Sequence, residues 1–240
     1  MYTLTFILVQ LISYTNPIAV GKTPGYITGE NSYFVFEEFV QNVHSQINDP
    51  ELKFEALKQA LKGYNLLRFR KILNNNSILT IIDYSKPSDT KRFFVIDINK
   101  RKILYKSLVA HGKNSGVQYA SSFSNKHFSY KSSIGFFLTD ETYNGKHGYS
   151  LRLIGLEKDI NDNARERAVV IHSASYVNEK FINKYGRLGR SHGCPALPSD
   201  NYKNIVEVIK NKTCLFIYYP DKEYLHDSEF INTSGKISVN

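Results

Sequence analysis

A cysteine and a distant histidine are the side chains in this sequence whose types are best suited to catalysis. Cys194 lies within residues 191–195 (SHGCP), and His172 follows an apolar run at 169–171. A nucleophilic cysteine needs a base that forms the thiolate, a partner that orients the base, and N–H donors for the oxyanion. A histidine at the end of a strand is held rigidly enough to act as the base. The pair therefore predicts covalent catalysis through a thiol.

Residues next to the pair are candidates for the other roles. Ser173 follows the histidine and could fix the imidazole tautomer through its hydroxyl or its carbonyl. Gly193 allows the backbone to approach a substrate closely, so the N–H groups around Gly193 and Cys194 are candidate oxyanion donors. Pro195 has no N–H and is excluded as a donor.

Other interpretations of the same residues stay open on spacing alone. The cysteine could be a buried structural thiol, with the histidine hydrogen-bonded in a turn. A disulfide between Cys194 and Cys214 is a second alternative, because the chain has two cysteines. Zinc bound by His172, His192 and Cys194 is a third, but this spacing matches none of the paired ligand patterns of zinc sites. We expect no metal and no cofactor.

The elements that must hold these residues are mostly strands. Seven segments rich in β-branched and aromatic residues are expected to be strands: 77–84, 92–98, 102–110, 134–139, 150–154, 167–172 and 213–219. Their close spacing predicts a mainly β fold with a few helices (α+β) and mostly antiparallel pairing. The central part of the chain, residues 115–133, is rich in serine and is expected to be a loop.

Three helices are expected. Apolar residues recur at helical spacing over 36–47 and again over 54–64. The second helix is predicted to open at Asp49, as N-cap, with Pro50 in its first turn. The third is predicted over 201–210, with Ser199 or Asp200 as its cap.

Composition limits the classes of partner. The formal net charge is +9, but Lys and Arg are scattered without a block of five, which disfavours nucleic acid and permits an anionic envelope. No apolar run reaches about 18 residues, so no integral membrane anchor is expected. Residues 1–21 contain an apolar stretch followed by a small-x-small site and predict a signal peptide, although basic residues do not precede the stretch. A buried N-terminal element is the alternative.

The change from helical to strand period near 74–76 predicts the division of the chain. We expect a signal peptide at 1–21, a helical N-terminal segment at 22–76, a catalytic domain at 77–221 and a flexible tail at 222–240. The sequence gives no indication of the oligomeric state.

The residues around Cys194 resemble the signature of the murein L,D-transpeptidases, cysteine enzymes that remodel bacterial peptidoglycan. The likeness extends over residues 78–219 and follows the branch that has Gly-Cys-Pro-Ala after its serine. The segments that carry it lie at 93–109, 109–116, 122–125, 130–136, 143–153 and 186–198. Residues 195–197 (PAL) stand where the better-known branch has a polar residue, often Arg or Asn.

This resemblance implies the fold and the roles. It implies an L,D-transpeptidase-like β-sandwich or barrel preceded by a small helical segment. Cys194 would be the nucleophile and His172 the base, Ser173 would orient the base, and His192 and Gly193 would shape the oxyanion pocket. If the resting enzyme holds a thiolate–imidazolium pair, we expect the pKa of the thiol below its usual value and that of the imidazole above.

The resemblance also implies a substrate and a compartment. Peptidoglycan tetrapeptide stems would form an acyl-thioester on the cysteine, and the acceptor would be a second stem. Water as acceptor would make the protein an L,D-carboxypeptidase. A non-catalytic wall-binding module is a third hypothesis. An exported protein of the periplasm or cell envelope is expected. The candidates for substrate contact are Tyr149, Ser150, Arg152, Arg190 and Ser191, with the polar turn at 111–116 as a possible wall of the cleft.

Overall fold

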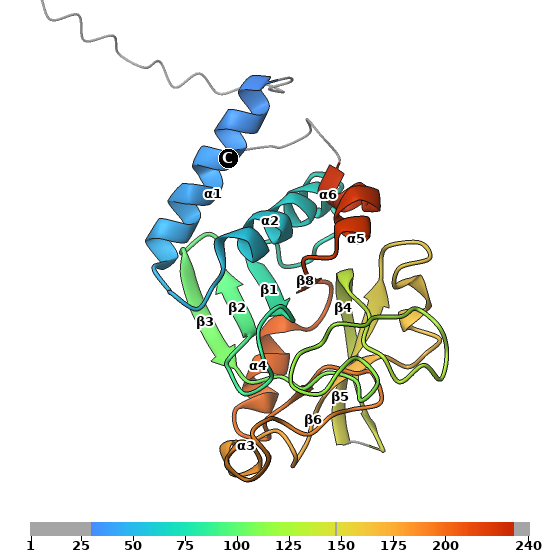
Figure 1. The fold of residues 1–240 in the computed structure, drawn as a ribbon. Helices are drawn as coiled ribbons and strands as arrows, with labels where there is room; N and C mark the ends of the chain where they lie inside the picture. Colours follow the sequence, from blue (N-terminus) through green and yellow to red (C-terminus); the bar gives the residue numbers. More distant parts are fainter. Residues whose placement is uncertain (1–29, 147, 233–240) are drawn as a thin grey trace, which may run out of the picture.

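The computed structural model describes residues 30–146 and 148–232, with side chains from residue 34 onwards. Eight strands form one sheet in the order β3-β2-β1-β8-β4-β5-β6-β7 (Figure 1). The strands are β1 Ile78–Asp83, β2 Phe93–Asp97, β3 Lys102–Ser107, β4 Gly135–Gly145, β5 Gly148–Gly155, β6 Val170–Ser173, β7 Ala196–Leu197 and β8 Cys214–Tyr218. Pairing is antiparallel except between β1 and β8 and between β6 and β7. The expected mainly β fold with a few helices is therefore confirmed.

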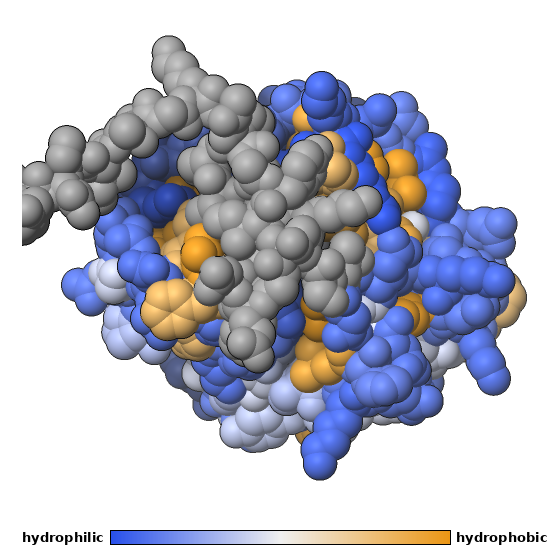
Figure 2. All heavy atoms as spheres, turned by 90° about the horizontal axis from the view of Figure 1, so that it is seen from above, coloured by the Kyte–Doolittle hydropathy of each residue, from blue (hydrophilic) through white to orange (hydrophobic). Residues whose placement is uncertain are grey.

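Most of the helices lie at two opposite ends of the molecule. The helices are α1 Glu30–Ile47, α2 Phe54–Phe69, α3 Glu179–Tyr185, α4 Tyr202–Ile209, α5 Lys222–Asp227 and α6 Glu229–Asn232, with a short 3-10 turn at Asp162–Ala164. In Figure 1, α1, α2, α5 and α6 gather at one end of the molecule, and α3 lies at the opposite end. Viewed from the end with α1 and α2, the described surface is mainly hydrophilic, with separate hydrophobic areas (Figure 2).

The helical segment and the sheet share one hydrophobic core. Leu57, Leu61 and Tyr64 of α2 are fully buried, and α2 contacts both β1 and β8. Phe36 and Val40 of α1 belong to the same buried cluster. Burying one such leucine contributes about 1.5–3 kcal/mol relative to leaving it exposed. The helical residues that precede the sheet are therefore part of the body that supports it.

The start of α2 differs from the prediction. The helix begins at Phe54 after Lys53, whereas Asp49 lies in a separate turn. The Asp49 carboxylate accepts the Glu51 N–H at 2.9 Å and also pairs with Lys106 Nζ at 2.7 Å. Asp49 was wrong as an N-cap because its side chain closes this turn and ties it to β3.

The start of α4 also differs. Its N-cap is Asn201, in the left-handed conformation with φ of 59°, so Ser199 and Asp200 were wrong as caps. Asparagine tolerates this conformation better than most residues, which allows the chain to turn sharply into the helix. Ser199 and residues 201–204 line a hollow that is described below.

The first part of the expected tail is folded. The Asp221 carboxylate caps α5 by accepting the Tyr224 N–H at 2.9 Å, and Phe230 of α6 stacks on Phe136 with ring centroids 5.2 Å apart. Flexibility was therefore the wrong expectation for 222–232, because these short helices bury aromatic side chains against the core. Residues 233–240 and the predicted signal peptide at 1–21 lie outside the described residues. Within the described ranges, no helix is long and apolar enough to cross a membrane.

A buried arginine anchors the chain that leaves β3. Arg92 donates to the Val109 carbonyl from Nε at 3.1 Å and from Nη2 at 2.8 Å. Its Nη2 also lies 2.8 Å from His111 Nδ1, which must accept because guanidinium nitrogen only donates. Burial, with the Arg92 charge second, lowers the pKa of His111 to about 3. The neutral His111 and the turn that follows it are thus held in a fixed position.

Candidate active site

The sheet places the expected base beside the chain that carries the cysteine. His172 on β6 faces Ser150 of β5 on one side and Ala196 of β7 on the other. The His172 N–H donates to the Pro195 carbonyl at 3.4 Å. Cys194 comes immediately before Pro195 in the sequence, so the short β7 strand fixes its distance from β6. A separation of 22 residues in sequence is thereby reduced to neighbouring strands.

The imidazole of His172 is held in one tautomer. Its Nδ1 lies 3.0 Å from the Ser173 carbonyl, which can only accept, so Nδ1 carries the hydrogen. In the neutral ring, Nε2 then holds the lone pair that can take a proton. The ring is buried, with 4% of the residue exposed. Ser173 therefore contacts the imidazole through its backbone carbonyl, one of the two possibilities that the sequence left open.

The thiol of Cys194 is neutral in this environment. The residue is half-buried, and its Sγ lies 3.7 Å from the Ala168 carbonyl, to which S–H can donate. Burial raises the pKa of Cys194, and the Val170 N–H and the charge of Arg167 oppose this increase without cancelling it. The expected depression of the thiol pKa was wrong, because desolvation outweighs the groups that favour the thiolate.

The second cysteine lies elsewhere. Cys214 is fully buried at the start of β8, and both cysteines are free. The disulfide alternative is therefore excluded for this structure. Among the described residues, no group of three or more His, Cys, Asp or Glu side chains is arranged to hold a metal ion.

Ser191 shapes the turn that presents the cysteine. Its hydroxyl donates to the Cys194 carbonyl at 2.6 Å and accepts the Gly193 N–H at 3.0 Å. The Gly193 amide is therefore already engaged. The Cys194 amide has no hydrogen bond among the described residues, which leaves it available to an oxyanion. Ser191 is buried, so it supports the turn from inside.

Gly193 is required by its surroundings. Its φ is +128°, and a Cβ at this position would lie 2.8 Å from the Lys131 carbonyl oxygen. The Gly193 carbonyl accepts the Ser132 hydroxyl at 2.9 Å. His192 is exposed, and its ring lies 4.7 Å from that of Tyr130. The serine-rich loop thus packs directly on the cysteine turn and forms one wall of the site.

The turn after β3 joins the same wall. The Ser191 N–H donates to the His111 carbonyl at 2.9 Å, and Gly112 forms an isolated bridge with Ser191. The Gly112 N–H donates to the Ser132 hydroxyl at 3.0 Å. The turn anchored by Arg92 therefore braces both the cysteine turn and the serine-rich loop.

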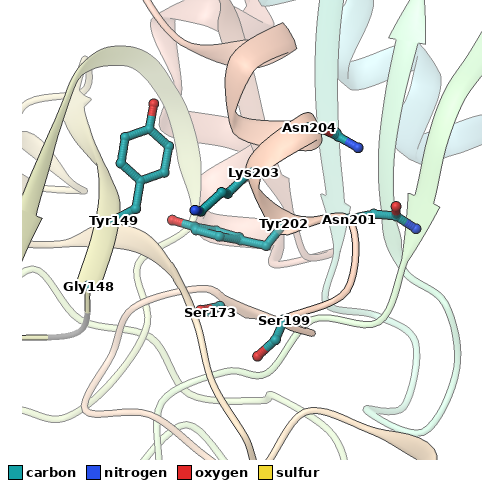
Figure 3. Close-up of a pocket in the computed structure, with 8 residues that line it drawn as sticks. All are labelled: Gly148, Tyr149, Ser173, Ser199, Asn201, Tyr202, Lys203 and Asn204. Carbon is teal, nitrogen blue, oxygen red and sulfur yellow. The ribbon is translucent and has the colours of Figure 1, made fainter.

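A hollow of about 430 Å³ opens beside the end of β6 (Figure 3). Figure 3 shows the Lys203 side chain extending towards the Tyr202 hydroxyl, with Tyr149 across the hollow and Ser173 and Ser199 below. Tyr202 donates its hydroxyl to the Ile171 carbonyl at 2.8 Å, which ties the floor of the hollow to β6. The lining is polar and carries one cation, Lys203.

Comparison with known families gives the identity of the domain. A family model described as "L,D-transpeptidase catalytic domain" matches residues 48–218. The chain belongs to this family. The match includes α2, which the sequence analysis had placed before the catalytic domain. The comparison with curated proteins finds no match.

Solved L,D-transpeptidases share low identity with this chain. An L,D-transpeptidase from Mycobacterium smegmatis is 16% identical, with a TM-score of 0.38 over 60% of this chain and 59% of that one. L,D-transpeptidase 1 of Mycobacterium tuberculosis is 16% identical, with a TM-score of 0.34 over 59% and 61%. One from Stackebrandtia nassauensis is 12% identical, with a TM-score of 0.36 over 83% and 96%. This chain thus spans about three fifths of the length of the mycobacterial proteins.

The candidate substrate contacts of this L,D-transpeptidase domain fall into two groups. Tyr149 lines the hollow and donates its hydroxyl to Glu207 at 2.5 Å. Ser150 is buried, and its hydroxyl donates to the Gly148 carbonyl at 3.1 Å. Both lie on β5, beside the strand that carries His172.

The two arginines have partners within the chain. Arg152 Nε lies 3.5 Å from Glu141, and its guanidinium stands 4.0 Å from the Tyr143 ring centroid. Arg190 Nη1 donates to the carbonyls of Lys113 at 3.0 Å and Gly116 at 2.8 Å. Arg152 therefore forms an ion pair at the surface, and Arg190 holds the turn after His111.

Arg167 is the residue that sequence reasoning missed. Its guanidinium reaches the cysteine turn, where its charge lowers the pKa of Cys194 against the effect of burial. The sequence analysis treated Arg167 as the first residue of a strand, but β6 begins at Val170. No spacing rule marks an arginine that comes close to the cysteine only through the fold.

Proposed function

We propose that this domain is a peptidoglycan L,D-transpeptidase that acts on tetrapeptide stems through an acyl-thioester on Cys194. The observation that carries the proposal is the β6–β7 pairing, which sets His172 beside the cysteine segment with its Nδ1 hydrogen bonded to the Ser173 carbonyl. A non-catalytic wall-binding module has no need of a fixed tautomer at this position.

The first step forms the thioester. His172 Nε2 takes the Sγ proton of Cys194, and the sulfur attacks the carbonyl of the L-residue that precedes the terminal D-amino acid. A C–S bond forms, the C–N bond breaks, and the protonated imidazole gives its proton to the departing amine. A base is needed because burial keeps the resting thiol neutral. The oxyanion would accept the Cys194 N–H, since the Gly193 N–H is held by Ser191.

The second step transfers the acyl group. His172 deprotonates the amine of a second stem, the amine nitrogen attacks the thioester carbonyl, and the C–S bond breaks to restore the thiol. Tyr149 and Ser173 line the hollow and would contact the stem peptide. Ser191, Gly193 and His192 would act by shaping the turn. No cofactor takes part in either step.

The compartment follows from the substrate. Peptidoglycan lies outside the cytoplasm, so the protein would work in the periplasm or cell envelope after export directed by residues 1–21. Its net charge of +9 suits an anionic envelope.

The test is incubation of the purified protein with peptidoglycan, followed by mass analysis of the released stems. New stem-to-stem links support the transpeptidase. Loss of one D-residue without new links identifies the L,D-carboxypeptidase, in which water is the acceptor. Unchanged stems in the presence of folded wild-type protein would overturn both enzymes and favour a wall-binding module. The Cys194→Ala variant serves as the control for contaminating activity.

A further inference from the structure

The guanidinium of Arg167 is bonded only to neutral oxygen atoms. Nη1 donates to the Ser124 carbonyl at 2.7 Å and to the Ser133 hydroxyl at 2.5 Å. Nη2 donates to the Lys131 carbonyl at 2.8 Å and reaches the Ser129 hydroxyl at 3.4 Å. These contacts hold the serine-rich loop in place, but none of them neutralises the charge.

Carboxylates nearby in the sequence are bound elsewhere. Arg165, two residues earlier, pairs with Asp140 and Glu141, and Glu166 lies 3.6 Å from His127. Among the described residues, no carboxylate forms an ion pair with Arg167. Arg167 is half-buried, and burial lowers its pKa. A charge taken out of water without a counter-charge is costly, so an anion formed close to Arg167 would be stabilised.

The group whose negative charge acts on Arg167 is the thiol of Cys194, which raises the pKa of the guanidinium against the effect of burial. Arg167 Nη2 lies 3.7 Å from the position that a Cβ would take on Gly193, the residue before the cysteine. Ala168, which follows Arg167, supplies the carbonyl that lies 3.7 Å from Sγ. Arg167 thus approaches the cysteine turn both through its side chain and through the backbone beside it.

The other titratable groups around Cys194 do not supply a permanent positive charge. The phenols of Tyr84 and Tyr176 have pKa values raised by burial to about 12, so they are neutral over the working range. His172 on β6 must be neutral to act as the base, and His192 is exposed in the turn itself. The guanidinium is the cation that is permanently present at this thiol.

We propose that Arg167 is the built-in counter-charge for the thiolate of Cys194, and that it holds the loop at 124–133 against the cysteine turn while doing so. When His172 removes the Sγ proton, the negative charge forms beside a cation that lacks a carboxylate partner. Arg167 is a positioning residue, because it acts on the thiol through its field and on the turn through the loop. The inference rests on Cys194 being the reactive thiol of the proposed function.

The experiment measures the rate of iodoacetamide alkylation at Cys194 against pH, with the site of labelling identified by mass spectrometry. Arg167→Gln removes the charge and should move the profile of the thiol upwards by about one pKa unit. Alkylation at pH 8 should then fall about tenfold, because each unit changes the thiolate fraction tenfold. Arg167→Lys keeps a charge, and its profile should lie closer to that of the wild type.

A second pair of variants leaves the arginine in place. Ser133→Asp puts a carboxylate beside Nη1 and neutralises the guanidinium, whereas Ser133→Asn is a neutral side chain of nearly the same size. The aspartate variant should slow alkylation in the same way as Arg167→Gln, and the asparagine variant should not. This pair separates the effect of charge from the effect of loop packing, and it remains informative if Arg167→Gln fails to fold.

Two outcomes would overturn the inference. One is superposition of the alkylation profiles of wild type and Arg167→Gln. The other is an equal shift for Ser133→Asp and Ser133→Asn, which would mean that only the loop matters. Because alkylation needs no peptidoglycan, a shifted profile in a protein that leaves stems unchanged would refute the proposed function and leave the role of Arg167 intact.

Discussion

The two cysteines of this chain occupy opposite kinds of environment. Cys214 lies on β8 at the centre of the sheet, where burial alone raises its pKa. Cys194 lies in a polar turn, where burial also raises the pKa but the Val170 N–H and Arg167 act against it. Both thiols are neutral at rest. The difference lies in the groups that can stabilise a thiolate once it forms, and only Cys194 has them.

This comparison shows that burial does not by itself distinguish a structural thiol from a reactive one. A buried thiol without polar neighbours is a small apolar side chain. A half-buried thiol with a base, an amide and a counter-charge can ionise when the base acts. The following substitutions test this distinction between the two cysteines.

Removing the reactive thiol has the largest expected effect. Cys194→Ala should reduce stem rearrangement to the background, because it removes the sulfur that carries the acyl group in the proposed mechanism. The melting temperature should change little, since the residue is only half-buried. Mass analysis of stems gives the activity, and thermal unfolding gives the stability. Residual activity equal to that of the wild type would show that Cys194 is not the nucleophile.

Removing the base has the next largest effect. His172→Gln keeps a polar side chain but cannot take the Sγ proton, and general-base catalysis contributes typically about 10²–10⁴-fold. Turnover should fall within that range, and iodoacetamide alkylation of Cys194 near neutral pH should slow. If the rates for wild type and variant coincide across the pH range, His172 does not activate the thiol.

Distorting the cysteine turn has an intermediate effect. Gly193→Ala puts a Cβ against the Lys131 carbonyl and strains a backbone with φ of +128°. A displacement of about 1 Å at a reacting group can cost about 10²-fold in rate, and we expect a loss of that order. Gly186→Ala is the matched control, because φ is +68° there but nothing lies within 4 Å. It should cost about 1–2 kcal/mol of stability and leave turnover per folded molecule unchanged.

Changing the core thiol should affect stability alone. Cys214→Ser buries a hydroxyl in an apolar strand at a cost of about 1–3 kcal/mol, and Cys214→Ala should cost less because it buries no polar group. Turnover per folded molecule should match the wild type in both. Urea unfolding measures the first quantity and stem analysis the second. Native-state labelling of Cys214 as fast as that of Cys194 would contradict the contrast between the two regions.

Much of the fold follows from the sequence, because periodicity reports which face of an element is buried. The strands β1, β2 and β8 and the helix α4 lie within the predicted ranges. Helix α3 was missed because it has only seven residues and none of them is buried, so its apolar pattern is too short to stand out. Strand β7 was missed because it has two residues, and its pairing depends on contacts distant in sequence.

The candidate site also has residues that the sequence predicts and residues that only the fold reveals. His172 and Cys194 were recognisable because residue type and local sequence carry their chemistry. The contributions of Arg167 and of the Cys194 amide depend on which hydrogen bonds other groups have already taken. Ser191 illustrates this dependence, since its hydroxyl engages the Gly193 N–H that the sequence favoured as an oxyanion donor.

The segment that connects β6 to β7 has a consequence for how this domain can be altered. Helix α3 carries no buried residue, begins at the cap formed by Asn178 and ends at Gly186 in the left-handed conformation. The base and the nucleophile are fixed by β6 and β7 on either side of it, and Val177 and Leu188 are buried where this segment begins and ends. The exposed residues 183–186 between these two anchors are therefore a natural insertion point, at which a longer loop or a whole binding module can be grafted without moving the reacting groups.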